Sequence, residues 1–460
     1  MHPTHDDRVV AGLADGIGGP LGTRAGPGGW WTPMRVVLLL TAVCFALGMV
    51  QKAPCFADSW NDGEARYTAM CYSDLPYLYT ERGFAEQAWP YDDDPAVRER
   101  YEVMEYPVAT SYLVYGVAVL THLVAGPDDL AERADRPVDD LAAPEVIDRE
   151  VRWFVAVNAL VLALLTLGAA AFLVRVNPGR PWDAVAFAVS PALALTGLVN
   201  WDLLAVVLVA GALWAFARDR PVLTGVLVGV GVAAKLYPLF LLGGVLVVLL
   251  RRRAWSDLAG CGLAALLAWL ALNVPAALSS RDAWERFWSF NADRGPDLGS
   301  LWLVWDQATG SSTSADTVNQ VSLVFFALWC VGVLVVGLRA PSEPRLAQLA
   351  FLVVAGFLLV NKVYSPQYVL WLLPLAVLAR PRWRDLLIWQ AGEVLYFACV
   401  WWYLAGILEA GSGGDSPFYW IAILVRVACQ LWLVAVVTRD VLRPAHDPVV
   451  RPAPVEVRTA

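Results

Sequence analysis

Long apolar segments alternate with short polar turns over most of the chain. The apolar runs fall near 35–50, 106–125, 151–174, 184–199, 203–217, 221–234, 238–250, 255–274, 321–338, 346–360, 368–379, 386–408 and 417–437. A full crossing takes about 20 apolar residues in a helix, and several of these runs are shorter. Short or Pro-broken helices are typical of segments that line a cavity inside a bundle. The pattern predicts an all-α polytopic membrane protein with about 12 transmembrane helices.

Arg residues recur in alternate turns from residue 175 onward. They are Arg175, Arg180, Arg218, Arg220, Arg251, Arg252, Arg253, Arg339, Arg345, Arg380, Arg382, Arg384, Arg439 and Arg443. Short loops rich in Arg stay in the cytoplasm. We therefore expect these turns and both termini on the cytoplasmic side of a cell membrane, and the turns between them on its outer side. The run 106–125 then cannot cross fully, and we expect it to lie at or dip into the outer leaflet. A full crossing there, the alternative, would invert every later Arg turn.

The arrangement predicts a single transmembrane catalytic unit, residues 35–440, with two long outer loops at 51–150 and 275–320. The tails 1–34 and 441–460, the first rich in Gly and Pro and the second in Pro, are expected to be disordered and cytoplasmic. A loop as long as 51–150 is usually functional, and we expect it to hold helices at the membrane surface.

Composition narrows the function classes. The chain is 58% hydrophobic and 17% charged, so the bilayer is its expected environment, and its net charge of −8 argues against a nucleic-acid partner. The four His residues and the scattered acids show no metal-ligand spacing, and we predict no metal and no cofactor. Cys55 and Cys71 are the two cysteines of the long loop; outside the cytoplasm they can form a disulfide, and the alternative is two free thiols packed near the interface.

Asp74 is the first candidate for chemistry. It lies in the segment Tyr72-Ser73-Asp74-Leu75-Pro76-Tyr77 of the first outer loop. A carboxylate at the lip of a dry cavity can have its pKa raised and act as a general base for a hydroxyl acceptor. The alternatives are a solvated loop acid or an N-cap of a helix over 75–85.

Basic side chains near the outer face are the second set of candidates. Lys235 and Lys362 each follow an apolar helix and precede a Tyr by two positions, so they suit an anionic ligand such as a phosphate, or they snorkel to lipid headgroups. Asp202 needs a partner, and we expect Lys235 or Lys362 to supply it as a structural ion pair. Arg294 can clamp a phosphate or be an ordinary loop residue.

Several motifs that follow one another in a fixed order resemble those of a known group of enzymes over most of residues 35–380. They are Tyr72–Tyr77 with Trp89-Pro90-Tyr91 and Glu105-Tyr106-Pro107, Asn200-Trp201-Asp202 after Ser190-Pro191, Ala234-Lys235-Leu236-Tyr237-Pro238, and Lys362-Val363-Tyr364-Ser365-Pro366-Gln367-Tyr368. This set resembles the polyprenol-phosphate-mannose-dependent mannosyltransferases of the GT-C superfamily, especially glycosyltransferase family 87. It is also similar to the catalytic subunit of GPI mannosyltransferase I.

The resemblance implies a GT-C-type helical bundle in which Asp74 is the catalytic base of an inverting transfer, usually without a metal. The mannosyltransferase I motif has a second acid where this chain has Pro76, which weakens any case for a metal bridge; Asp58 and Asp62 remain alternative bases. The implied substrate contacts are Tyr77, Tyr106, Asp202, Lys235, Tyr237, Arg294, Lys362, Tyr364, Gln367 and Tyr368.

We therefore expect a hexosyltransferase that moves a sugar, mannose by resemblance, from a polyprenyl-phosphate donor to a lipid or glycan acceptor on the outer face. A nucleotide-sugar donor would call for a Rossmann-like domain, and none is visible. The main alternative is a multi-pass transporter or flippase. A transporter predicts two similar halves and mid-membrane ionisable residues, whereas the acids here concentrate in outer loops.

Overall fold

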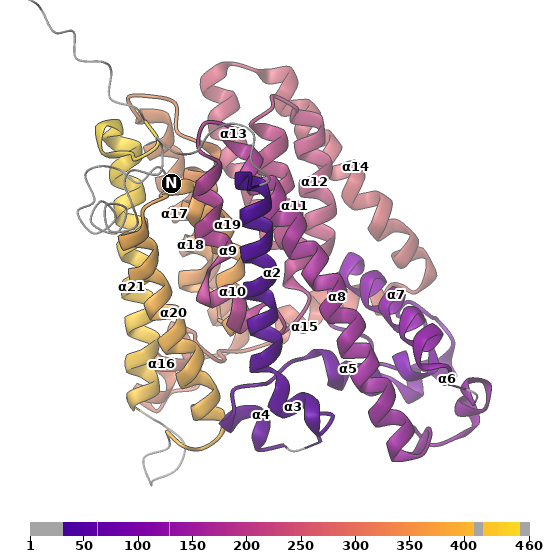
Figure 1. Ribbon diagram of the computed structural model, residues 1–460. Coiled ribbons are helices and arrows are strands. Elements are labelled where there is room, and N and C mark those ends of the chain that lie inside the picture. Colours follow the sequence, from indigo (N-terminus) through magenta and orange to yellow (C-terminus); the bar gives the residue numbers. More distant parts are fainter. Residues whose placement is uncertain (1–30, 62, 128, 409–416, 451–460) are drawn as a thin grey trace, which may run out of the picture.

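The computed structural model describes residues 31–61, 63–127, 129–408 and 417–450. Over these ranges the chain forms helices and no strand, which confirms the predicted all-α polytopic class. Figure 1 shows a bundle of long, roughly antiparallel helices with short helices gathered at one end.

The α-helices and the 3-10 helices (η) have the following bounds. They are α2 (Pro33–Gln51), α3 (Ala53–Ala57), α4 (Ala65–Thr68), α5 (Leu75–Glu81), η1 (Phe84–Glu86), α6 (Pro95–Arg100), α7 (Val108–Ala125), η2 (Leu130–Asp135), η3 (Val138–Asp140), α8 (Pro144–Val176), η4 (Pro181–Ala184), α9 (Val185–Ala188), α10 (Pro191–Thr196), α11 (Asp202–Phe216), α12 (Pro221–Ala234), η5 (Tyr237–Phe240), α13 (Leu241–Arg252), α14 (Trp255–Ser279), α15 (Arg281–Asp293), α16 (Leu301–Thr309), α17 (Ala315–Arg339), α18 (Leu346–Val360), η6 (Pro366–Tyr368), α19 (Val369–Ala379), α20 (Trp383–Leu404), α21 (Pro417–Leu442) and η7 (Pro444–His446).

Six helices of the described chain are long and apolar enough to cross a membrane. They are α2, α7, α8, α14, α17 and α21. Other segments are apolar but short, among them α11, α12 and α18. Breaks such as the one at Ser190, where the chain leaves α9 and Ser190 caps α10, divide further segments into pieces. The expected twelve crossings therefore stay a prediction.

The Arg-rich turns lie together at one end of the bundle, which we call the arginine end. Arg251, in the last turn of α13, donates to the backbone oxygen of Ala340 at 2.9 Å. Arg380, just after α19, pairs with Asp385 of α20 at 2.9 Å and with Asp440 of α21 at 2.5 Å. These bonds join turns that are far apart in sequence, as expected if the Arg turns share one side of the membrane.

The opposite end, which we call the cavity end, carries the first long loop and α7. Thr110, near the start of α7, donates to the backbone oxygen of Ala234 at the end of α12, at 2.8 Å. Near the other end of α7, the His122 ring bonds the Tyr79 hydroxyl, which also donates to Glu150 in the early part of α8. Both ends of α7 thus contact the cavity end, although its length and hydropathy would allow it to cross. Whether 106–125 lies at the outer leaflet or crosses the membrane stays a prediction.

Close helix packing fixes the end of α12, where Lys235 lies. A Cβ added at Gly225 or Gly229 would come within 2.1 Å of the backbone oxygens of Cys261 and Ala265 in α14. Small residues four apart let two helix backbones approach in this way, and they are common at helix contacts in membranes. The α12–α14 contact therefore depends on the absence of side chains at these two positions.

The first long loop is ordered by a buried ion pair and by a disulfide. Arg133 donates to both carboxylate oxygens of Glu150, at 2.9 and 2.7 Å, and both side chains are fully buried. Cys55 and Cys71 are joined by a disulfide, which is the pairing the sequence allowed. The disulfide joins α3 to the segment after α4, and the ion pair joins η2 to α8. Figure 1 shows α3, α4 and α5 gathered at the cavity end.

Candidate functional site

A cavity of about 530 Å³ opens at the cavity end. Its walls come from six parts of the chain: the first long loop, residues 199–200, Lys235 at the end of α12, the end of α15 with the turn after it, residues 365–368, and the end of α20. Of the predicted site residues, the cavity wall contains Asp74, Tyr77, Tyr106, Lys235, Arg294, Gln367 and Tyr368. Loops separated by almost 300 positions in sequence therefore meet around one space.

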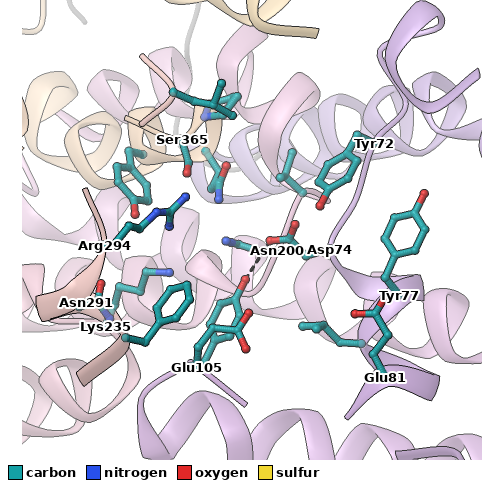
Figure 2. A pocket seen from close by; sticks show the side chains of 18 of the residues that line it. Tyr72, Asp74, Tyr77, Glu81, Glu105, Asn200, Lys235, Asn291, Arg294 and Ser365 are labelled. Atoms are coloured by element: carbon teal, nitrogen blue, oxygen red, sulfur yellow. Dashed lines mark hydrogen bonds between the residues drawn. The ribbon is translucent and has the colours of Figure 1, made fainter. Parts of the chain in front are cut away.

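Asp74 lies in the middle of this cavity (Figure 2). It is the residue before α5, but its side chain makes no helix-cap bond; instead it accepts from the Tyr106 hydroxyl at 2.8 Å. Its backbone N–H donates to the Val199 oxygen at 2.8 Å, which ties the loop to the segment before α11. Burial raises the pKa of Asp74, and the Tyr106 bond lowers it by less. Of the alternatives for this residue, neither the solvated acid nor the N-cap describes this arrangement.

Lys235 enters the same cavity from the end of α12. Its ammonium pairs with buried Asp202 at 2.8 Å, and Asp202 also accepts from the Trp371 indole at 3.0 Å. Burial lowers the pKa of Lys235, but the attraction and hydrogen bond of Asp202, together with the attraction of Tyr368 and Asp74, outweigh this, and the net pKa is raised. Asp202 is thus the structural partner that the sequence predicted, and it keeps a cation at the cavity wall.

Arg294 follows α15 and faces the cavity beside Lys235 (Figure 2). It is paired with Asp297, whose carboxylate accepts from its Nε at 3.0 Å. The backbone N–H of Asp297 donates to the Lys362 oxygen at 2.8 Å, and that of Tyr364 donates to the Leu298 oxygen at 2.7 Å. These bonds fasten the turn of Arg294 to the loop that carries Gln367 and Tyr368.

Four predicted site residues do not line the cavity: Asp202, which lies behind Lys235, and the three residues Lys362, Tyr364 and Tyr237. The Lys362 ammonium donates to the Asn319 side chain at 2.6 Å and to the Ala292 oxygen at 3.3 Å. Tyr364 is fully buried and donates to Glu393, and Tyr237 is buried in a stack against Trp371 with ring centroids 4.7 Å apart. The structure therefore gives Lys362 a bridging role between α15 and α17 and brings only Lys235 of the two lysines to the cavity.

Asp58, one of the two alternative bases, lies outside the cavity wall. Its side chain accepts from the Trp60 backbone N–H at 3.0 Å. Asp62 lies outside the described residues. Pro76, in place of the second acid, is buried in the first turn of α5. Among the described residues, no three His, Cys, Asp or Glu side chains are grouped so as to hold a metal ion.

Sequence reasoning did not name a second set of cavity residues as site residues, and it missed two buried charged side chains, Glu393 and Arg426. These wall residues include Arg66, Tyr67, Tyr72, Glu81, Arg82, Glu105, Asn200 and Trp401. Behind the wall, the Arg426 guanidinium lies 3.5 Å from the centre of the Tyr364 ring and donates to the Gly299 oxygen at 3.2 Å. Glu393 and Arg426 interrupt apolar segments, and an ionisable residue inside such a segment is the signal that could have revealed them.

A comparison with protein families adds independent information on the central part of the chain. Residues 149–361 match the model of glycosyltransferase family 87. Over these residues the chain is similar to glycosyltransferase family 87, which supports a membrane glycosyltransferase. The match confirms the resemblance and covers Asn200, Asp202, Lys235 and Arg294, while Asp74 and residues 362–368 lie outside the matched range. A comparison with curated proteins gave no match.

Proposed function

We propose that this protein transfers a hexose, mannose by resemblance, from a polyprenyl-phosphate donor to an acceptor hydroxyl at the outer membrane face. The observation that carries the proposal is the placement of Asp74, a half-buried carboxyl with a raised pKa, opposite Lys235 and Arg294 in one cavity. A base and two cations across a shared space are what the deprotonation of a hydroxyl and the departure of a phosphate require.

Asp74 is the best-placed base among the carboxylates of the cavity wall. Glu105 is held by Arg82 at 3.2 Å, and Glu81, whose side chain is 56% exposed, also lies near Arg82. A carboxylate that is ion-paired or well solvated is a weaker base than one whose charged form is poorly stabilised by its surroundings. Asp74 is therefore the carboxyl expected to take a proton near neutral pH.

The reaction is a single displacement. The acceptor oxygen forms a bond to the anomeric carbon while its proton passes to Asp74. The bond between that carbon and the phosphate oxygen breaks, and its electron pair leaves with the polyprenyl phosphate, whose charge Lys235 and Arg294 stabilise. Attack from the face opposite the leaving group inverts the anomeric configuration.

The proposed orientation follows from the arginine end. Arg-rich short turns favour the cytoplasmic side, so the cavity at the other end opens outside. A donor that is itself a lipid suits this side, because its tail stays in the bilayer while its phosphate meets the cations at the surface.

The test is sugar transfer by the purified protein in liposomes. Polyprenyl-phosphate mannose, polyprenyl-phosphate glucose and GDP-mannose, each radiolabelled in the sugar, are supplied with a mixed membrane-lipid and glycan acceptor extract. We expect product from the mannosyl lipid, with the anomeric configuration opposite to that of the donor. Product from GDP-mannose alone, or labelled lipid that crosses the bilayer without transfer, would overturn the proposal.

A further inference from the structure

Two loops that are far apart in sequence build one side of the cavity. Turn 294–300, after α15, supplies Arg294 and Leu298, and segment 361–368, after α18, supplies its last four residues. Figure 2 shows Arg294 and Ser365 on the same side of Asp74. Turn 294–300 and the first part of segment 361–368 are not helical. The position of one loop relative to the other therefore depends on what packs behind them.

Polar contacts join the two loops to each other and to the last two long helices. The backbone bonds from Asp297 and from Tyr364 join turn 294–300 to segment 361–368. Gly299 donates its N–H to the Tyr419 hydroxyl of α21 at 3.0 Å, and Tyr396 of α20 donates to the Tyr364 oxygen at 2.5 Å. Gly299 has a φ of +70°, and a Cβ there would lie 2.1 Å from the Tyr396 hydroxyl. The turn can approach α20 this closely only because the residue is a glycine.

Arg426 of α21 contacts both loops at once. Its guanidinium carbon lies 3.5 Å from the centre of the Tyr364 ring, and its Nη2 donates to the Gly299 oxygen at 3.2 Å. Its Nη1 donates to Gln430 of the same helix at 3.3 Å, and the side chain is fully buried. Glu393 of α20, which carries the opposite charge, accepts from the Tyr364 hydroxyl at 3.0 Å. Charged side chains inside a membrane bundle are costly to bury and usually mark a functional site.

We propose that Arg426 is a positioning residue for the phosphate side of the cavity. It does not line the cavity itself. Through Gly299 and the Tyr364 ring it holds turn 294–300 and segment 361–368 in one arrangement. The inference rests on the proposed function and deepens it by naming a residue that controls donor binding without touching the donor.

A short path leads from Arg426 to the cation at the cavity. Gly299 lies two positions after Asp297, whose carboxylate accepts from the Arg294 Nε at 3.0 Å and from the Leu298 N–H at 2.6 Å. A shift of Gly299 therefore displaces the group that orients the Arg294 guanidinium. A displacement of about 1 Å in a positioning group can cost roughly 10²-fold in rate, so the fit at Gly299 matters for the cation.

The alternative is that Arg426 only stabilises the contact between α20 and α21, and a second buried arginine allows the comparison. Arg380, at the arginine end, is also fully buried and joins the same two helices through Asp385 and Asp440. Arg380→Met and Arg426→Met make the same chemical change at the two ends of one helix pair. Only Arg426 contacts the loops of the cavity, so the two roles predict different results.

The first test is hydrogen–deuterium exchange of the protein in nanodiscs, with no substrate present. We expect the backbone N–H groups of turn 294–300 and segment 361–368 to exchange faster in Arg426→Met than in wild type, and to be unchanged in Arg380→Met. Arg426→Lys keeps the charge but lacks the flat guanidinium that covers the Tyr364 ring while bonding Gly299. It should loosen the same loops to a smaller extent, and it serves if Arg426→Met does not fold. Unchanged exchange in these loops, or equal changes in Arg380→Met, would overturn the proposal.

The second test measures the consequence for the donor. We expect the donor KM to rise roughly tenfold in the Arg426 variants, with a much smaller change in acceptor KM. Arg380→Met should lower the thermal midpoint and leave the ratio of the two KM values as in wild type. Exchange needs no substrate, so it supports the positioning of the loops even if the lipid donor is not used and the proposed function fails. Loosened loops with an unchanged donor KM, or equal rises in both KM values, would show that Arg426 does not position the phosphate side.

Discussion

At the scale of single residues, the character of Asp74 comes from groups that are distant in sequence. The loop sequence predicts a carboxyl near the membrane surface, but its bond from Tyr106 and its backbone tie to Val199 exist only in the fold. The raised pKa of Asp74 follows chiefly from burial, since the Tyr106 bond acts in the opposite direction. The position of Asp74 in the sequence therefore suggested the base, and its packing in the fold accounts for its raised pKa.

Replacing Asp74 tests that chemistry directly. Asp74→Asn keeps the size of the side chain and its bond from Tyr106 but cannot accept the proton of the acceptor. We expect the transfer rate to fall roughly 10²- to 10⁴-fold, with the thermal midpoint nearly unchanged. Asp58→Asn, in the same loop but off the cavity wall, is the matched control. Loss of transfer in Asp58→Asn, with an active Asp74→Asn, would reassign the base.

The pH dependence carries a defined sign. Asp74 works as a base only when ionised, so kcat falls as the pH drops through its raised pKa. The Tyr106 bond lowers that pKa, and Tyr106→Phe removes the bond while keeping the ring. The acidic limb of the kcat–pH profile should therefore move to higher pH in this variant. A limb that stays in place or moves to lower pH would show that another group limits the rate.

Two lysines, Lys235 and Lys362, lie in similar local sequences but have different partners in the fold. Lys235 and Lys362 both follow an apolar helix and precede a Tyr by two positions. Only Lys235 finds a buried acid, Asp202, that holds it at the cavity, whereas Lys362 turns to Asn319. The neighbouring helices decide in which direction a side chain points after a helix end. The sequence could therefore predict a lysine at each of these positions but not the group that it contacts.

At the scale of elements, the Cys55–Cys71 disulfide closes a loop that supplies two residues of the cavity wall, Arg66 and Tyr67. Cys55 and Cys71 are 16 positions apart, and Arg66 and Tyr67 lie between them in and around the short helix α4. A four-residue helix has little stability of its own. The disulfide therefore limits how far this part of the wall can move away from Tyr72.

Removal of the disulfide should show in stability and in acceptor use. Opening a loop of this length costs about 3 kcal/mol of unfolding free energy. In Cys55→Ser/Cys71→Ser we expect a lower thermal midpoint and a raised acceptor KM, with a smaller change in donor KM. Thermal melts and transfer assays with and without dithiothreitol check this. The Cys261→Ser variant, at a buried free cysteine, is the control for the loss of a thiol elsewhere. Equal effects in both variants would contradict a specific role of the disulfide in stability and acceptor use.

The helices that were hardest to anticipate are those with charges buried behind the cavity. Hydropathy located α20 and α21 well, but it treats every apolar residue alike and so gave no partner for Glu393 or Arg426. The structure joins both to Tyr364, and Arg426 also reaches Gly299 in the turn after Arg294. Long-range polar contacts of this kind arise from tertiary packing, which no local pattern contains.

At the scale of the whole molecule, charge separates the two ends of the bundle. The Arg turns converge at one end, and the cavity, the disulfide and the first long loop lie at the other. The sequence predicted this separation because each Arg turn is local and the positive-inside rule acts turn by turn. It could not predict the shape of the cavity, which depends on how short helices such as α15 settle between their neighbours.

Labelling can establish which end faces outward. In a cysteine-reduced background, Ser312→Cys between α16 and α17 marks the cavity end, and Arg253→Cys after α13 marks the arginine end. Both positions are exposed. A membrane-impermeant maleimide added to intact cells should modify position 312 and reach position 253 only after lysis. Position 411 lies outside the described residues. Labelling of position 253 in intact cells would invert the proposed topology.

The location of the Cys55–Cys71 disulfide determines the stage of maturation at which this bond can form. In the proposed orientation, these thiols meet an oxidising compartment only after their loop has been translocated. A newly made chain whose loop is still on the cytoplasmic side would therefore lack the disulfide that restrains the cavity wall near Asp74. Oxidation of the two thiols would then complete this part of the cavity wall only in molecules whose loop has reached the outer side of the membrane.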